Sequence, residues 1–190
     1  KEFEQPENVR TYSRQEFETL FAFRHQEDPQ QILQVHREQL NYHVDEWEVV
    51  NQSAQGFRLA RTTSGRKMAH GQLIALCPHD GEHFFLARTT WLMQEREGGL
   101  IAGVDALPGI PQTTAARVRD PEGGSSGKYH PAFLLPAIPS VDAEQSLVLP
   151  SGWYRPGRIV DLFTEHALQV RLLHVLDDGP DFERVAFTVC

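Results

Sequence analysis

Asn51, Ser53 and Gly56 form the segment of this chain whose residue types and spacing are best suited to binding chemistry. The segment lies between two short apolar runs, residues 47–50 and 57–59. Asn and Ser side chains hydrogen bond to nearby backbone amides, and Gly allows a positive φ or a close approach of a ligand. The pattern predicts a tight turn between two strands. The same polar groups are suited to holding a phosphate, whereas the simpler interpretation is a self-bonded turn that sets strand register.

Three arginines are candidate cationic partners of this turn. Arg58 follows it closely, and its alternation with Phe57 and Leu59 predicts that it points away from the apolar face, toward a ligand. Arg10 and Arg14 form an Arg-x-x-x-Arg pair upstream, on one shared face if their segment is helical. Guanidinium groups form charge-assisted hydrogen bonds with phosphates. Each of these arginines also has the simpler interpretation of an ordinary surface charge.

Other clusters of reactive residues are weaker candidates. Cys77, His79 and His83 include good zinc ligands, but their segment has the Pro, Asp and Gly content of a hairpin tip. The Gly- and Ser-rich residues 123–128 lack the residue order of a phosphate-binding loop. The remaining histidines form no triad pattern, and Trp91 is predicted to lie in the core. We therefore predict no catalytic residue, no metal site and no cofactor.

Composition excludes several classes of function. The net charge is −8, and acids outnumber bases in residues 1–43, 44–107 and 108–190 alike, so binding of a nucleic-acid polymer is not expected. No apolar run approaches the roughly 20 residues of a membrane-spanning helix, so membrane insertion is not expected. Two distant cysteines and the absence of a recognisable signal peptide predict a cytoplasmic location. The first residue, Lys1, predicts that the chain is part of a larger protein.

The elements that must position these residues are mostly strands. Residues 1–43 are predicted to form a helical segment, because residues 13–16 match a capping box and apolar residues recur at helical spacing. Beyond it, short apolar runs alternate with Gly and Pro turns, which favours small antiparallel barrels or sandwiches. The expected strands are residues 47–50, 57–59, 73–76, 84–93, 100–107, 133–135, 147–149, 158–163, 168–176 and 182–189. The fold class is therefore mainly β, an α+β chain with an N-terminal helical segment.

The domain organisation follows from composition. We predict a helical segment over 1–43, a β-barrel over 44–119 and a second β-rich, barrel-like unit over 128–190. Residues 108–116 are expected to be a connector, and the Pro-, Gly- and Ser-rich residues 120–127 mark the boundary. A weak internal repeat pairs residues 56–60 with 146–150 and residues 71–76 with 157–162. It indicates tandem barrels, although β-rich sequences also produce such likeness by chance.

Residues 44–107 resemble the PilZ domain family of small β-barrels. The likeness rests on the Asn-x-Ser-x-x-Gly turn, Gly71 before an apolar strand, Trp91 near the end of a strand, and residues 103–104 in the returning strand. The resemblance implies a non-catalytic bacterial signalling module that binds cyclic di-GMP. It further implies that an Arg-x-x-x-Arg motif works with the turn, and Arg10 and Arg14 are the matching pair.

Three hypotheses follow. In the first, the chain is a signalling module in which Asn51, Ser53, Gly56, Arg58, Arg10 and Arg14 bind cyclic di-GMP. In the second, it is a ligand-free interaction or scaffold domain with a protein partner, because the arginine pair lies far upstream of the turn and the chain is acidic. In the third, it is an enzyme that uses a metal at Cys77, His79 and His83.

Overall fold

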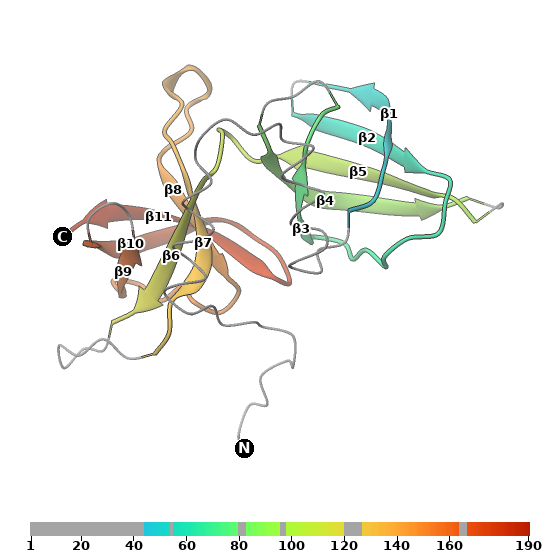
Figure 1. Ribbon diagram of the computed structural model, residues 1–190. Helices are drawn as coiled ribbons and strands as arrows, with labels where there is room; N and C mark the ends of the chain where they lie inside the picture. Colours follow the sequence, from blue (N-terminus) through green and yellow to red (C-terminus); the bar gives the residue numbers. More distant parts are fainter. Residues whose placement is uncertain (1–43, 54, 80–82, 96–97, 120–126, 164–166) are drawn as a thin grey trace.

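A computed structural model describes residues 44–190 except 54, 80–82, 96–97, 120–126 and 164–166 (Figure 1). The predicted helical segment over 1–43, with Arg10 and Arg14, lies outside the described residues. The described part consists of antiparallel strands and a single short 3-10 helix, η1, at Pro139–Val141. The expectation of a mainly β, antiparallel fold is confirmed.

The first unit is a five-stranded sheet with the order β1-β2-β5-β4-β3. Its strands are β1 Glu48–Gln52, β2 Gly56–Arg61, β3 Leu73–Leu76, β4 Phe85–Gln94 and β5 Leu100–Ala106. Alternation along β2 puts Phe57 and Leu59 on an inner face, where Leu59 packs with Ala87, Ala102 and Val104. Arg58 is exposed on the opposite face.

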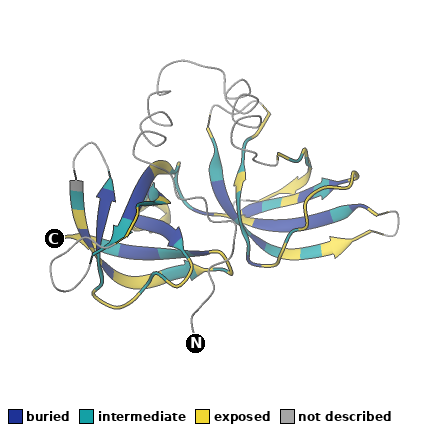
Figure 2. Ribbon diagram, turned by 60° about the horizontal axis from the view of Figure 1, so that its bottom comes forward, coloured by how far each residue is buried: buried dark blue, intermediate teal, exposed yellow. Residues whose placement is uncertain are grey.

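The second unit is a closed barrel of six strands with the order β10-β11-β8-β7-β6-β9. Its strands are β6 Gln112–Val118, β7 His130–Leu135, β8 Ser146–Pro150, β9 Ile159–Phe163, β10 Ala167–Asp178 and β11 Phe182–Val189. The interior is filled by small and branched side chains, among them Ala116, Leu147, Val160, Leu172 and Val185. Figure 2 shows this buried interior running along the barrel strands.

Strand pairing changes two sequence-based expectations. Residues 108–116 were expected to form a connector, yet β6 begins at Gln112. β6 pairs with β7 and β9, so the predicted boundary at 120–127 falls between two paired strands of one barrel. The first unit was expected to be a barrel but is an open sheet among the described residues, because β6 closes the second unit instead. Thr114 and Ala116 are small and gave no strong apolar signal.

The internal repeat is visible in the pairing of the strands. The order β1-β2-β5-β4-β3 matches β7-β8-β11-β10-β9, and β6 is the additional strand of the barrel. Gly71 and Gly157 precede equivalent strands with φ values of 76° and 74°. The Gly71 N–H donates to the Thr89 carbonyl at 2.8 Å, and the Gly157 N–H donates to the Leu172 carbonyl at 3.0 Å. The two sequence segments that contain these glycines therefore take the same local conformation.

An apolar cluster joins the two units. Phe182 of the barrel is 1% exposed and packs with Leu86 and Leu107, which belong to or follow strands of the first sheet. Two polar contacts flank this cluster. Arg88 Nη1 lies 2.5 Å from Asp177 Oδ1, and the Leu73 N–H donates to Asp181 Oδ1 at 3.0 Å. The β10–β11 hairpin thus contacts β3 and β4 of the first sheet.

Candidate functional site

The predicted turn is present and its polar groups bond to one another. The Ser53 N–H donates to the Gly56 carbonyl at 2.9 Å. Ser53 Oγ accepts from the Gly56 N–H at 3.2 Å and from the Gln55 N–H at 3.3 Å. Asn51 Oδ1 accepts from the Gln52 N–H at 2.8 Å. The side chains named by the motif therefore hold the turn in shape, and Asn51 and Ser53 remain exposed to solvent.

Gly56 is required by packing at the start of β2. A Cβ at this position would collide with the Val104 carbonyl of β5. Gly56 is buried although it borders an exposed turn, since it pairs directly with Asp105. The Asn-x-Ser-x-x-Gly spacing thus combines two structural needs: a self-bonded turn and a close approach of two strands.

Asn51 and Arg58 belong to one continuous row across four strands. Asn51 is the register partner of Arg58, Arg58 of Gly103, and Gly103 of Trp91. Directly opposed residues in antiparallel strands point to the same face. The row therefore places the amide, the guanidinium and the indole on the outer face of the first sheet, with a glycine between the two larger side chains.

Trp91 lies over the glycine of this row. A Cβ at Gly103 would collide with the five-membered ring of the Trp91 indole, so only a glycine leaves room for it. Trp91 is 41% exposed, and the Arg58 guanidinium carbon lies 5.9 Å from its ring centroid. The prediction that Trp91 is a core residue is wrong. A register shift between Thr89 and Trp91 turns its side chain to the outer face.

The outer face of the first sheet also contacts the barrel. Asp105 follows Gly103 by two residues on β5 and is the register partner of Arg88. Arg88 pairs with Asp177 of the barrel at 2.5 Å. Successive outward-facing residues on a strand lie roughly 7 Å apart. The Arg58–Trp91 row and the contact between the two units are therefore adjacent on a single face.

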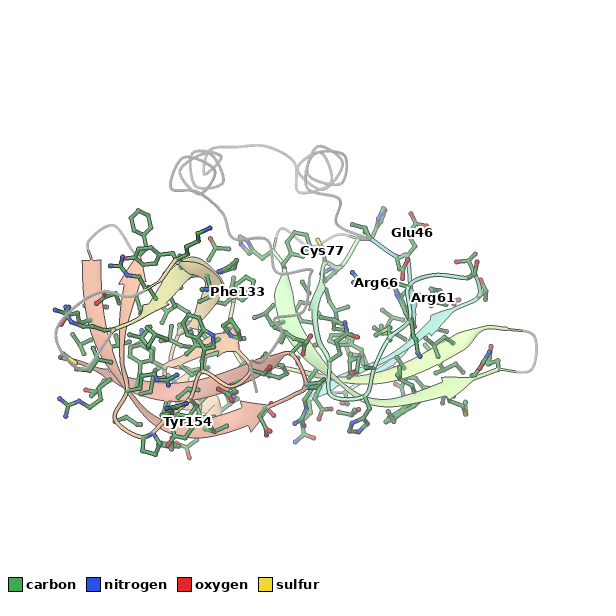
Figure 3. The ribbon with its side chains drawn as sticks, turned by 90° about the horizontal axis from the view of Figure 1, so that it is seen from below. Glu46, Arg61, Arg66, Cys77, Phe133 and Tyr154 are labelled. Carbon is green, nitrogen blue, oxygen red and sulfur yellow. The ribbon has the colours of Figure 1, made fainter. Side chains whose placement is uncertain are left out.

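Arg61 lies on the opposite face of the first sheet. It is 7% exposed on the inner side of the sheet, where it pairs with Asp45 and stacks 4.8 Å over the Trp47 ring. Its Nη2 also donates to the Arg66 carbonyl at 3.3 Å, and Figure 3 shows Arg61 beside Arg66. Alternation along β2 places Arg61 on the same face as Phe57 and Leu59. Its interactions make it a structural residue.

The barrel carries a charged cluster that the sequence analysis missed. Asp161 on β9 is 6% exposed and accepts from Arg117 Nη2 at 3.2 Å and Arg119 Nη1 at 3.5 Å. Arg117 also stacks 4.5 Å over the Tyr129 ring. Arg117 and Asp161 are direct register partners on β6 and β9. The local sequence did not indicate this cluster, because Arg117 and Asp161 lie 44 residues apart and meet only through the pairing of β6 with β9.

The metal hypothesis gains no support from the described residues. Within them, no group of three or more His, Cys, Asp or Glu side chains is arranged to hold a metal ion, and Cys77, His79 and His83 do not form one. Burial raises the pKa of the Cys77 thiol, which favours the protonated form. A search of the described residues for a helix long and apolar enough to span a membrane gave none.

A family model matches the barrel of this chain, and a solved structure is weakly similar to most of the chain. A family model described as the FimW C-terminal beta-barrel domain matches residues 114–190, a range that begins within β6. No curated protein matches the chain. Among solved structures, the K. pneumonia protein MrkH in its apo state is similar over 87% of each chain, with 10% sequence identity and a TM-score of 0.24.

Proposed function

We propose that this chain is a non-catalytic signalling module of the PilZ type that binds cyclic di-GMP on the outer face of its first sheet. The Asn51–Gly56 turn would form one end of the site and Arg58 its cationic centre. Arg10 and Arg14 would supply further cationic contacts, as the resemblance of residues 44–107 to the PilZ family implies.

The register partnership of Asn51 and Arg58 carries this proposal. It places the exposed polar turn and an exposed guanidinium side by side on the outer face, where a phosphate can approach both. Arg58 has no carboxylate partner among the described ion pairs, whereas Arg61, Arg88 and Arg117 each have one. An unneutralised guanidinium is the better phosphate ligand, because no existing ion pair must be broken.

The second candidate function is a ligand-free scaffold domain. It is favoured by the exposed apolar side chains on the first sheet, which include Val49, Val50 and Met93. Exposed apolar side chains on both β1 and β4 are suited to contact with a protein partner. The local hydrogen bonds of Ser53 also fit this alternative, since they use the hydroxyl without any ligand.

Calorimetric titration of the whole chain with cyclic di-GMP distinguishes the two functions. Arg58→Ala is expected to weaken binding about tenfold or more, because charge-assisted hydrogen bonds to the ligand are lost. Arg171→Ala is the matched control, since Arg171 is an exposed arginine on β10 of the barrel. Absence of binding by the unaltered chain at high micromolar ligand would reject the signalling function. Equal losses for both variants would show that only general charge matters.

A further inference from the structure

We propose that Trp91 and Arg58 together form a guanine-reading platform, with Trp91 stacking on the base and Arg58 bonding to its edge. The inference rests on the proposed function and specifies how that site would choose its ligand. It assigns a binding role to Trp91, a residue that the Asn-x-Ser-x-x-Gly motif does not include.

The indole of Trp91 lies on the surface of the first sheet. Trp91 is 41% exposed although nearby apolar residues of β4 and β5, such as Ala87 and Ala102, are fully buried. Gly103 leaves room beneath it, so the ring lies against the sheet instead of projecting from it. A partly exposed aromatic ring that is supported by backbone is suited to stacking with a planar base.

The Arg58 guanidinium lies over the Trp91 ring. The Arg58 guanidinium carbon lies 5.9 Å from the Trp91 centroid, at the limit of a cation–π contact. A base that stacked on Trp91 in place of this guanidinium would leave Arg58 free to bond to one edge of the base. Guanine carries two acceptors, O6 and N7, on the edge that an arginine fork can bond, whereas adenine carries an acceptor and a donor there. The pair of residues thus favours guanine over adenine.

The Trp91–Arg58 platform is continuous with the Asn51–Gly56 turn. Asn51, Arg58, Gly103 and Trp91 are successive register partners, so the platform continues directly from the turn that the PilZ resemblance identifies. Adjacent strands lie about 4.8 Å apart, which places Asn51 and Trp91 about 14 Å apart across three strand spacings. A ligand with both phosphates and bases can span the cationic and the aromatic parts of such a row.

Titration of the whole chain with cyclic di-GMP and, separately, cyclic di-AMP tests the inference. The unaltered chain is expected to prefer cyclic di-GMP. Trp91→Ala should weaken its binding about 5- to 150-fold, the range found for loss of one base–aromatic stack, and Trp91→Phe should retain most of the affinity. Arg58→Lys keeps the charge but removes the fork, so it should reduce the preference for cyclic di-GMP over cyclic di-AMP about tenfold.

Met93→Ala is the matched control, because Met93 is an apolar residue of the same strand that is 47% exposed. It should leave affinity unchanged. If the unaltered chain binds cyclic di-GMP but Trp91→Ala, shown folded by circular dichroism, binds equally well, the platform is rejected and the proposed function stands. Equal affinity of the unaltered chain for the two dinucleotides would also reject it. If the unaltered chain binds neither, the proposed function and the platform both fail.

Discussion

Ser53 and Trp91 have different roles in the first sheet. The Ser53 hydroxyl is used within the turn, where it accepts from two backbone amides. Trp91 makes a contact that depends on a glycine of the neighbouring strand. The residue in the recognisable motif therefore stabilises local structure, while a residue outside the motif presents a surface suited to a ligand.

His130 is the residue whose environment predicts a pH dependence of stability. It is the first residue of β7 and packs edge-on against Trp153, with ring centroids 5.2 Å apart. Burial lowers its pKa below the usual 6.5, because a charged imidazole loses hydration there. Below about pH 6.5 the unfolded chain takes up this proton more readily than the folded chain, so stability falls with acidification.

Thermal denaturation across pH 5 to 8 measures this effect. The melting temperature of the unaltered chain should fall as the pH drops below about 6.5. His130→Gln should show a shallower fall over the same interval, since the group that titrates is removed. An unchanged slope in this variant would assign the pH dependence to other groups.

At the scale of elements, the pairing of β6 with β9 places a carboxylate beside two arginines on the barrel. Asp161 accepts from Arg117 and Arg119, so one carboxylate fixes two arginines that lie on and just after β6. Arg117 Nε is buried without a hydrogen-bond partner among the described residues. Removing the carboxylate would leave partly buried positive charge unbalanced at the point where β6 closes the barrel.

Asp161→Asn is expected to lower the free energy of unfolding by about 2–4 kcal/mol, because it breaks a largely buried ion pair but keeps the side-chain volume. Urea denaturation measures the change. Asp178→Asn is the control, since Asp178 is an exposed carboxylate on β10. A loss no greater than that of the control would mean that the cluster does not stabilise the barrel.

At the scale of the whole molecule, the two units have matching strand orders. They contact each other through the β10–β11 hairpin. Phe182 packs with Leu86 and Leu107, and Arg88 reaches Asp177. Gly179 belongs to the same contact, because a Cβ there would collide with the Gly71 carbonyl of the first unit. The contact lies on the sheet face that also carries Arg58 and Trp91. A ligand on that face would therefore be bound next to the barrel.

Phe182→Ala should loosen the first unit as well as the barrel. Truncating a buried Phe costs about 3–5 kcal/mol, and here the cavity would open between the units. Hydrogen exchange followed by mass spectrometry should show faster exchange in β3 and β4. Phe187→Ala is the matched control, because Phe187 also lies on β11 but packs against the barrel's own core. Faster exchange confined to the barrel in both variants would contradict a stabilising contact between units.

The sequence alone determined the turn and every strand but β6, because these depend on local signals. Period-2 alternation placed β2, with Arg58 outward and Leu59 inward, and the apolar run of residues 73–76 gave the bounds of β3. The Asn-x-Ser-x-x-Gly spacing predicted a turn whose hydrogen bonds are made within a few residues. The repeat was detectable because Gly71 and Gly157 need the same positive φ before equivalent strands.

Only the tertiary structure decided which residues meet. β6 lacks a strong apolar pattern and became a barrel strand because β7 and β9 offer it partners on both sides. Trp91 was expected in the core, yet a register shift in β4 and the space over Gly103 turned it outward beside Arg58. Such outcomes depend on pairing between strands distant in sequence, and a local pattern contains no information about that register.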